Sequence, residues 1–396
     1  MLFVSTHMES IGVTIMNYRR LGRTGLMVSE IGFGTEWMER HSADECKAVF
    51  DECEKHGINV FDCWMGNPEV RSSIGAAIRG KREKWYIQGH VGCIWENGQN
   101  TRTRDVAKCR PAFEDLLARF ETDYIDMGMI HNVDEISDWE GIKNGPFLQY
   151  MLELKECGKI RNTGLSTHNP DIARLVVDHG VVDMIMFSIN PAFDMLPPTE
   201  DINQYFAQEY DAGLGGIDVQ RAELYSMCEQ HDIGITVMKG YAGGRLFDAA
   251  RSPFGVALTP VQCLHYCLTR PAVAAVMVGY DTPEHVADAM AYETASDSEK
   301  EYESILANAP RHAYRGQCTY CGHCKPCPMN IDIALVNKYY DLATMQDKAP
   351  DTLKAHYASL SAKASQCIGC LDCESRCPFG VKIAERMVKA AELFGE

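Results

Sequence analysis

Two cysteine runs, CTYCGHCKPCP at residues 318–328 and CIGCLDCESRCP at residues 367–378, decide how the second part of the chain is organised. Each run contains three cysteines two residues apart, and then a fourth that is followed by proline. Three thiolates at this spacing can bind one iron cluster from a single loop. Zinc also binds paired cysteines, but its sites are built from separated pairs rather than from triplets closed by Cys-Pro. The runs therefore predict iron–sulfur clusters.

The fourth cysteine of each run predicts a crossed arrangement. In two-cluster ferredoxins this cysteine leaves its own loop and ligates the other cluster. On this pattern one [4Fe-4S] cluster is held by Cys318, Cys321, Cys324 and Cys377, and the other by Cys367, Cys370, Cys373 and Cys327. The first run has two residues before its last cysteine, where the common pattern has three. The segments Ile333–Met345 and Pro350–Ala364 have helical patterns, which predicts a mostly α-helical ferredoxin-type domain at 296–396.

Length and charge limit the possible partners and the compartment. A chain of 396 residues has room for one barrel-sized domain and a small second domain. Its net charge of -17 argues against nucleic acid and anionic membranes as partners. Free core thiols and ferredoxin-type clusters both indicate a reducing cytoplasm. Residues 1–16 lack the basic region of a signal peptide and are interpreted as an N-terminal extension, and no apolar run approaches the length of a membrane span.

The first part of the chain alternates between strand and helix patterns. A short turn-rich stretch at Tyr18–Glu30 predicts a hairpin, and eight strand segments follow, with helical patterns between and after them. This alternation predicts a (β/α)8 TIM barrel over residues 17–295. The predicted strands are Ile31–Thr35, Val60–Asp62, Trp85–Gln88, Tyr124–Ile130, Ile160–Leu165, Met184–Phe187, Gly234–Val237 and Ala274–Val278.

Several motifs in this part resemble the aldo/keto reductase family. They are IGFGT at 31–35, GINVFD at 57–62, YIDMGMIH at 124–131, GKIRNTGLS at 158–166 and AGGRL at 242–246. Their order and spacing are together more specific than any single motif. The fused cysteine domain is similar to the iron–sulfur branch of that family. The resemblance implies a TIM barrel with oxidoreductase activity, and a tail that crosses the barrel mouth, so the cluster domain is expected there.

The carboxyl ends of the strands carry the candidate site residues, because the chemistry of such barrels lies at that end. The candidates are Glu36, Asp62, His90, His131, Ser166, His168, Asn190 and Lys239. Asp62, His90 and His131 are the predicted catalytic residues. A carboxylate beside an imidazole favours its charged, proton-donating form, so we expect His90 to be the acid. His131 would then orient the substrate oxygen or share the proton.

The resemblance also implies a catalytic tetrad of Asp, Tyr, Lys and His, which this chain matches only in part. Asp62 and His131 match the aspartate and the histidine. The tyrosine position falls near Trp64 or Met65, and His90 stands at the lysine position. Neither Trp64 nor Met65 can give a proton, so carbonyl reduction by a tyrosine acid is not expected.

Cofactor binding is expected to differ from the family as well. Ser166, His168, Asn190 and Lys239 are the predicted cofactor-binding residues. Met186 and Met238 replace the glutamine and the ring-stacking tyrosine that the resemblance implies, and the loop GYDTPE at 279–284 has no cation for a 2′-phosphate. We therefore expect NAD(P)H to bind weakly or not at all. The acidic segment 191–216 is interpreted either as a lid or as a solvated insertion, and its acidity argues weakly against an anionic substrate.

Three functional hypotheses follow. The first is an oxidoreductase that acts on a small organic substrate and passes electrons through two clusters, with a ferredoxin or flavoprotein as electron donor. The second is metal-assisted chemistry, since His90, His131, His168 and Asp62 are ligand types that zinc and ferrous iron accept. The third is an electron-transfer subunit whose barrel is a docking scaffold.

Overall fold

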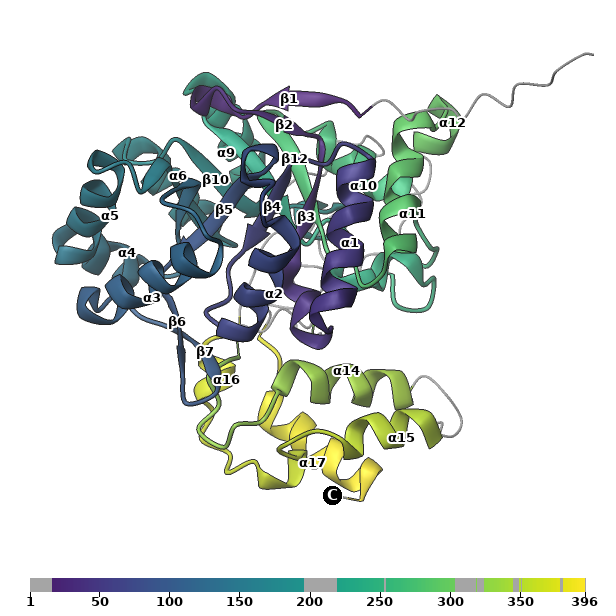
Figure 1. Cartoon of the computed structure of the whole chain (residues 1–396). Helices are drawn as coiled ribbons and strands as arrows, with labels where there is room; N and C mark the ends of the chain where they lie inside the picture. The colour runs from purple at the N-terminus through teal and green to yellow at the C-terminus, as the bar shows by residue number, and fades with distance from the viewer. Residues whose placement is uncertain are drawn as a thin grey trace, which may run out of the picture.

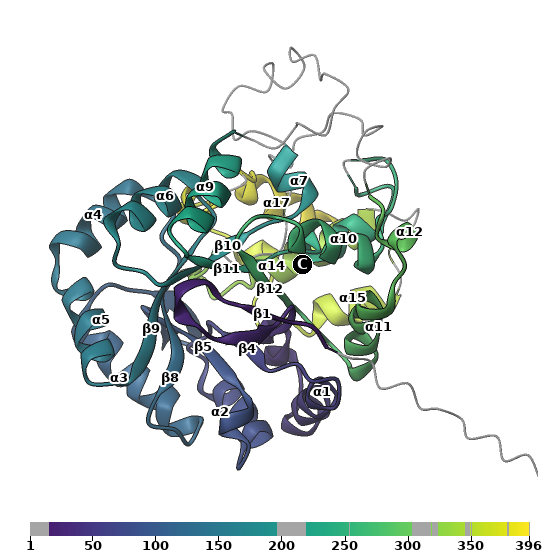
Figure 2. The ribbon, with the colours of Figure 1, turned by 90° about the horizontal axis from the view of Figure 1, so that it is seen from above.

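The computed structural model describes residues 16–195, 219–252, 254–302, 318, 324–344, 349, 351–377 and 380–395. Eight parallel strands close into a barrel in the order β3-β4-β5-β8-β9-β10-β11-β12, as Figure 2 shows from above. The predicted (β/α)8 barrel is therefore confirmed. The strands are β3 (Ile31–Gly34), β4 (Val60–Cys63), β5 (Tyr86–Val91), β8 (Ile125–Ile130), β9 (Ile160–Thr167), β10 (Met184–Ser188), β11 (Gly234–Met238) and β12 (Val273–Val278).

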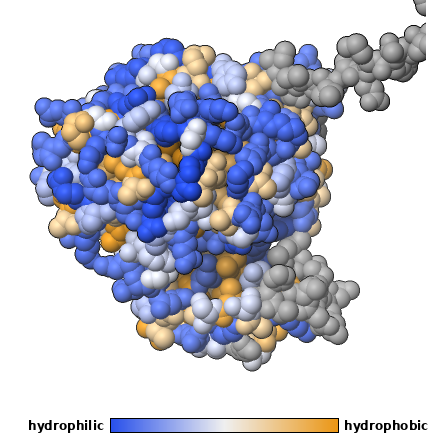
Figure 3. Space-filling view, in the orientation of Figure 1, coloured by the Kyte–Doolittle hydropathy of each residue, from blue (hydrophilic) through white to orange (hydrophobic). Residues whose placement is uncertain are grey.

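Helices surround the strands and separate them from solvent (Figures 1 and 2). The first begins at Ser42, whose side chain accepts the Glu45 amide while the Glu45 carboxylate bonds back to Ser42, a capping box worth about 1 kcal/mol. This first helix is α1 (Ala43–Lys55). It is followed by α2 (Pro68–Ile78), α3 (Val106–Arg119), α4 (Ile136–Asn144), α5 (Pro146–Glu156), α6 (Pro170–His179), α7 (Pro191–Met195), α9 (Val219–Gln230), α10 (Pro260–Leu268), α11 (Pro283–Thr294) and α12 (Asp297–Lys300). Figure 3 shows that their outer surface is mainly hydrophilic.

A hairpin closes the amino-terminal end of the barrel. Strands β1 (Tyr18–Arg20) and β2 (Met27–Ser29) pair antiparallel, as predicted, and Leu21 in the connection is fully buried. Gly22 has a φ of 47°, and a Cβ there would lie 2.1 Å from the Gly234 nitrogen. Only glycine fits so close an approach of two backbones. With this end plugged, the carboxyl ends of the strands form the open end.

A second hairpin, which the sequence reading missed, follows β5. Strands β6 (Cys93–Glu96) and β7 (Gln99–Arg102) pair antiparallel around Asn97–Gly98. Both turn residues have positive φ, 54° and 75°, as a two-residue type I′ turn requires. The hairpin projects from the barrel toward the second domain (Figure 1).

The second domain is mostly helical and has a core of its own. Its helices are α14 (Ile333–Thr344), α15 (Asp351–Ala358), α16 (Asp372–Ser375) and α17 (Ile383–Phe394), with a short turn η5 (Ala364–Gln366). Tyr357 stacks on Phe394 with ring centroids 4.0 Å apart, and Val336 and Met387 are buried beside them. Among the helices of the described ranges, none combines the length and apolarity that crossing a membrane requires.

The second domain lies against the carboxyl ends of the barrel strands (Figure 1). Arg245 of η4 (Ala242–Phe247) forms an ion pair of 3.3 Å with Asp341 of α14. Lys325 lies 3.9 Å from Glu39 in η2 (Thr35–Arg40) and 3.4 Å from Asp332 of its own domain. The expected position of this domain at the barrel mouth is therefore confirmed.

Candidate active site

One cavity of about 640 Å³ occupies the barrel mouth and extends to the second domain. Its volume falls within the range of roughly 300–1,000 Å³ that is usual for small-molecule sites. Its barrel lining includes Glu36, Asp62, His90, His131, Ser166, His168 and Lys239. The second domain adds Lys325, Pro326, Lys338 and Arg376. Seven of the eight strand-end candidates thus meet in one space that both domains enclose.

Asp62, His90 and His131 form a continuous hydrogen-bonded chain. His90 Nε2 lies 2.9 Å from Asp62 Oδ1, and His90 Nδ1 lies 2.9 Å from His131 Nδ1. His90 is buried, whereas His131 is partly exposed in the cavity. Because the Asp62 carboxylate accepts hydrogen bonds, His90 carries a proton on Nε2. Both ring nitrogens of His90 are therefore engaged by protein groups.

Two further buried side chains fix the aspartate and were not found from the sequence. Gln88 Nε2 donates to Asp62 Oδ1 at 2.7 Å, and Thr236 Oγ1 donates to Gln88 Oε1 at 3.0 Å. Asp62 Oδ1 therefore accepts from both Gln88 and His90. Gln88 and Asp62 are paired neighbours on adjacent strands, so their side chains share one face of the barrel interior. This arrangement holds the carboxylate in one position behind the histidines.

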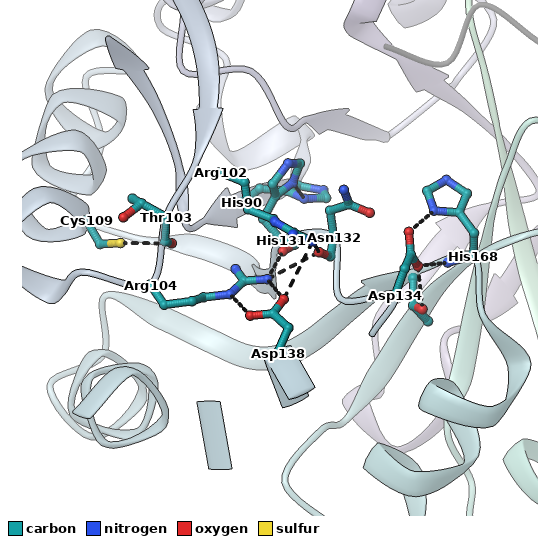
Figure 4. A network of polar contacts seen from close by, with 11 residues as sticks. His90, Arg102, Thr103, Arg104, Cys109, His131, Asn132, Asp134, Asp138 and His168 are labelled. Carbon is teal, nitrogen blue, oxygen red and sulfur yellow. Dashed lines mark hydrogen bonds and ion pairs between the residues drawn. The ribbon is translucent and has the colours of Figure 1, made fainter. Parts of the chain in front are cut away.

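His131 is held from two other directions. The Trp64 ring stacks on its imidazole, with centroids 5.7 Å apart and planes 11° apart. Arg104 Nη2 donates to the His131 carbonyl at 2.7 Å and pairs with Asp138 at the same distance, as Figure 4 shows. The ring and the backbone of His131 are thus positioned independently of His90.

The remaining candidates have separate environments. His168 Nδ1 pairs with Asp134 Oδ2 at 3.0 Å, away from the two other histidines (Figure 4). Lys239 follows β11 directly and has a φ of 62°, a conformation that is uncommon for a residue other than glycine. Asn190 is not in the cavity lining: its side chain donates to the Lys239 carbonyl and accepts the Phe193 amide, and so anchors the start of α7.

The barrel histidines are not arranged as a metal site. In the part of the chain that the structure describes, which includes all four proposed ligands, no three His, Cys, Asp or Glu side chains are grouped to hold a metal ion. The carboxylate partner of His168 is Asp134 rather than Asp62. The second hypothesis therefore has no support from the geometry.

In the second domain, the four cysteines of one crossed set, all within the described residues, line the same hollow, although their thiols are not drawn together as metal ligands. Cys327, Cys367, Cys370 and Cys373 line one small hollow together with apolar side chains such as Ile333 and Met387. Burial, and then the nearby thiols of Cys367, Cys370 and Cys327, raise the pKa of Cys373 to about 11. Four thiols in an apolar setting fit an iron–sulfur cluster. Of the other predicted set, Cys318, Cys324 and Cys377 are described, and Cys321 and most of the acidic segment 191–216 lie outside the described residues.

A parallel eight-stranded barrel with its cavity at the carboxyl ends of the strands, joined to a cysteine-rich helical domain, defines the class of protein. The Aldo/keto reductase family model matches residues 30–258, and a 4Fe-4S dicluster domain matches residues 275–382. The chain belongs to the aldo/keto reductase family and carries a C-terminal 4Fe-4S dicluster domain. It is an aldo/keto reductase-like oxidoreductase.

Relatives and solved structures agree with this assignment. An uncharacterized oxidoreductase of Bacillus subtilis, YqkF, is 24% identical over 318 residues, which cover 76% of this chain and 99% of that protein. An aldo-keto reductase from Bacillus halodurans in its holo form has a TM-score of 0.58 at 23% identity, over 76% of this chain and 98% of its own. An aldo/keto reductase from Klebsiella pneumoniae, solved in complex with NADP and acetate, has a TM-score of 0.53 at 22% identity, over 76% and 98% of the two chains. At these identities the solved structures are similar to this chain in fold alone.

Proposed function

We propose that this protein reduces, or in reverse oxidises, a small organic substrate in the barrel cavity with electrons passed through two [4Fe-4S] clusters. One observation carries the proposal: the cavity that contains Asp62, His90 and His131 is also lined by Lys325 and Arg376, which adjoin the predicted cluster ligands Cys324 and Cys377. A bound cluster supplies electrons one at a time. Two electrons and two protons reduce a carbonyl or a double bond, so the barrel residues must bind the substrate and deliver at least one of the protons, with water as the source of the other.

The proton donor in this proposal is His131 rather than His90. Reduction of a carbonyl or an activated double bond needs an acid as well as electrons. His90 has no ring nitrogen left for a substrate, because Nε2 is bonded to Asp62 and Nδ1 to His131. When the pair is neutral, one proton lies between the two Nδ1 atoms. An added proton can then be carried by His131, which is more exposed to the cavity than the buried His90.

The proposed acid replaces the tyrosine that the family resemblance implies. Trp64 stands near the tyrosine position and stacks on His131, so it packs against the acid and does not donate a proton. His90 stands at the lysine position and makes the link between Asp62 and His131. The proposed site thus keeps the aspartate and the histidine of the tetrad and connects them by a second histidine.

A redox assay with an artificial donor tests this proposal. Anaerobically prepared protein should oxidise reduced methyl viologen when a suitable small carbonyl or activated alkene from a panel is added. No turnover with any acceptor, together with electron transfer to a ferredoxin or a flavoprotein, would favour the electron-transfer subunit instead. A reaction that persists after the clusters have been removed would contradict the proposed electron path.

We further predict that NADPH binds more weakly than micromolar, or not at all. The only charged groups of the loop 279–284 are acidic, and one of them, Asp281, pairs with His41 at 3.1 Å. Calorimetry on anaerobic protein, with NADH titrated in parallel, measures the affinity.

Lys338 of helix α14 is the candidate phosphate partner if this prediction is wrong, because it lines the cavity and lies 5.1 Å from the Trp37 ring centroid. Micromolar NADPH binding that Lys338→Gln abolishes would contradict the prediction and move the phosphate partner to the second domain.

A further inference from the structure

Gln99 of the barrel domain is hydrogen-bonded to the backbone of Cys327, a predicted cluster ligand. Cys327 donates its amide hydrogen to Gln99 Oε1 at 2.8 Å, and Gln99 Nε2 donates to the Cys327 carbonyl at 3.0 Å. Gln99 Nε2 also donates to Asn330 Oδ1. One side-chain amide therefore satisfies both backbone groups of Cys327, in the manner of a neighbouring β-strand.

Gln99 lies on the β6–β7 hairpin, which hydrogen bonds fix to the barrel loops. It is the first residue of β7, directly opposite Glu96 of β6. The next residue, Asn100, accepts the Gly66 amide at 2.7 Å, and Arg102 Nη1 donates to the Asn132 carbonyl at 3.0 Å. The hairpin is thus bonded to the loops that follow β4 and β8, so the position of Gln99 is set by the barrel rather than by the second domain.

We propose that Gln99 is a positioning residue for the cluster that Cys327 ligates, and that it sets the reduction potential of that cluster. The proposal rests on the function proposed above, because it assumes that Cys327 with Cys367, Cys370 and Cys373 holds one [4Fe-4S] cluster. Hydrogen bonds to cluster sulfurs, local charge and exposure determine such potentials. A backbone amide beside a ligand thiol is a candidate donor to cluster sulfurs, and Gln99 Oε1 holds the amide hydrogen of Cys327. The barrel therefore holds the potential below the value that a free Cys327 amide would give.

Two substitutions at this position should shift the same potential in opposite directions. In Gln99→Ala the Cys327 amide is released and solvent access increases, so the reduced cluster is stabilised and its potential rises. In Gln99→Glu a carboxylate can still accept that amide, but it loses the bonds that Gln99 Nε2 donates and adds negative charge, so the potential falls. An anaerobic redox titration followed by electron paramagnetic resonance measures both clusters in each variant. The other cluster should keep its potential.

Glu96→Gln is the matched control, because Glu96 faces Gln99 on the same hairpin but pairs with Lys108 at 2.8 Å. It removes one charge but no contact with Cys327, so it should move the potentials less than either Gln99 variant does. Iron and sulfide contents are measured in parallel; loss of the Cys327 cluster alone in Gln99→Ala, with retention in Gln99→Glu, would also support positioning. Unchanged potentials in fully loaded variants, or loss of both clusters together, would overturn it. A wild-type protein without two clusters would instead contradict the proposed function.

Discussion

His131→Asn is expected to lower kcat by about 10²–10⁴-fold, the usual contribution of a general acid. Asparagine keeps a polar side chain of similar size but cannot carry the transferable proton. The Arg104 contact is to the backbone of residue 131, so the loop should keep its position. Steady-state rates with reduced viologen and the identified substrate measure the change, and substrate affinity and cluster content should remain those of the wild type.

His90→Asn separates the two histidines. Because His90 is buried and connects Asp62 to His131, its loss should leave the proton donor in place but break the hydrogen-bonded link from Asp62 to it. We expect a smaller loss of kcat than in His131→Asn, because the acid itself remains. His56→Asn changes a partly buried histidine that pairs with Glu52 and does not line the cavity, so it should leave the rate unchanged. A larger loss in His90→Asn than in His131→Asn would return the role of acid to His90.

The barrel could be predicted because its strands are nearly continuous apolar runs bounded by turn residues. β8 and β12 are buried along their whole length, and strands buried on both faces are typical of a parallel sheet covered by helices. The chain of Asp62, His90 and His131 followed from the same pattern, since successive parallel strands place their carboxyl ends side by side. The distances and the direction of the hydrogen bonds were needed to choose between the histidines.

Other parts of the site depended on side-chain orientation, which periodicity does not report. Asn190 follows β10 as expected, but its amide turns away to anchor α7. Gln88 lies inside a strand and resembles an ordinary polar residue until its contact with Asp62 is seen. The β6–β7 hairpin did have a signal, because Asn97–Gly98 is a strong type I′ turn pair. That signal could have identified Gln99 as the start of a strand, but not its contact with Cys327.

Pairs of cysteine substitutions should distinguish crossed from uncrossed cluster ligation. Wild-type protein should contain about eight iron and eight sulfide per chain, as two [4Fe-4S] clusters require, whereas zinc without sulfide would contradict the iron assignment. If the fourth cysteines cross, Cys327→Ala with Cys373→Ala removes two ligands from one cluster. The other cluster should then remain, with about four iron and an unchanged electron paramagnetic resonance signal.

The second pair, Cys324→Ala with Cys327→Ala, removes neighbours in the sequence that the crossed pattern assigns to different clusters. Neither cluster should then keep its wild-type signal, although the two cysteines lie in one short run. The structure favours this outcome, since Cys327 lines the same hollow as Cys367, Cys370 and Cys373 and Cys324 does not. Uncrossed ligation reverses the two results: the first pair would damage both clusters and the second only one. Cys157→Ala, which changes an exposed cysteine outside both runs, should retain all of the iron and shows whether loss is specific to the runs.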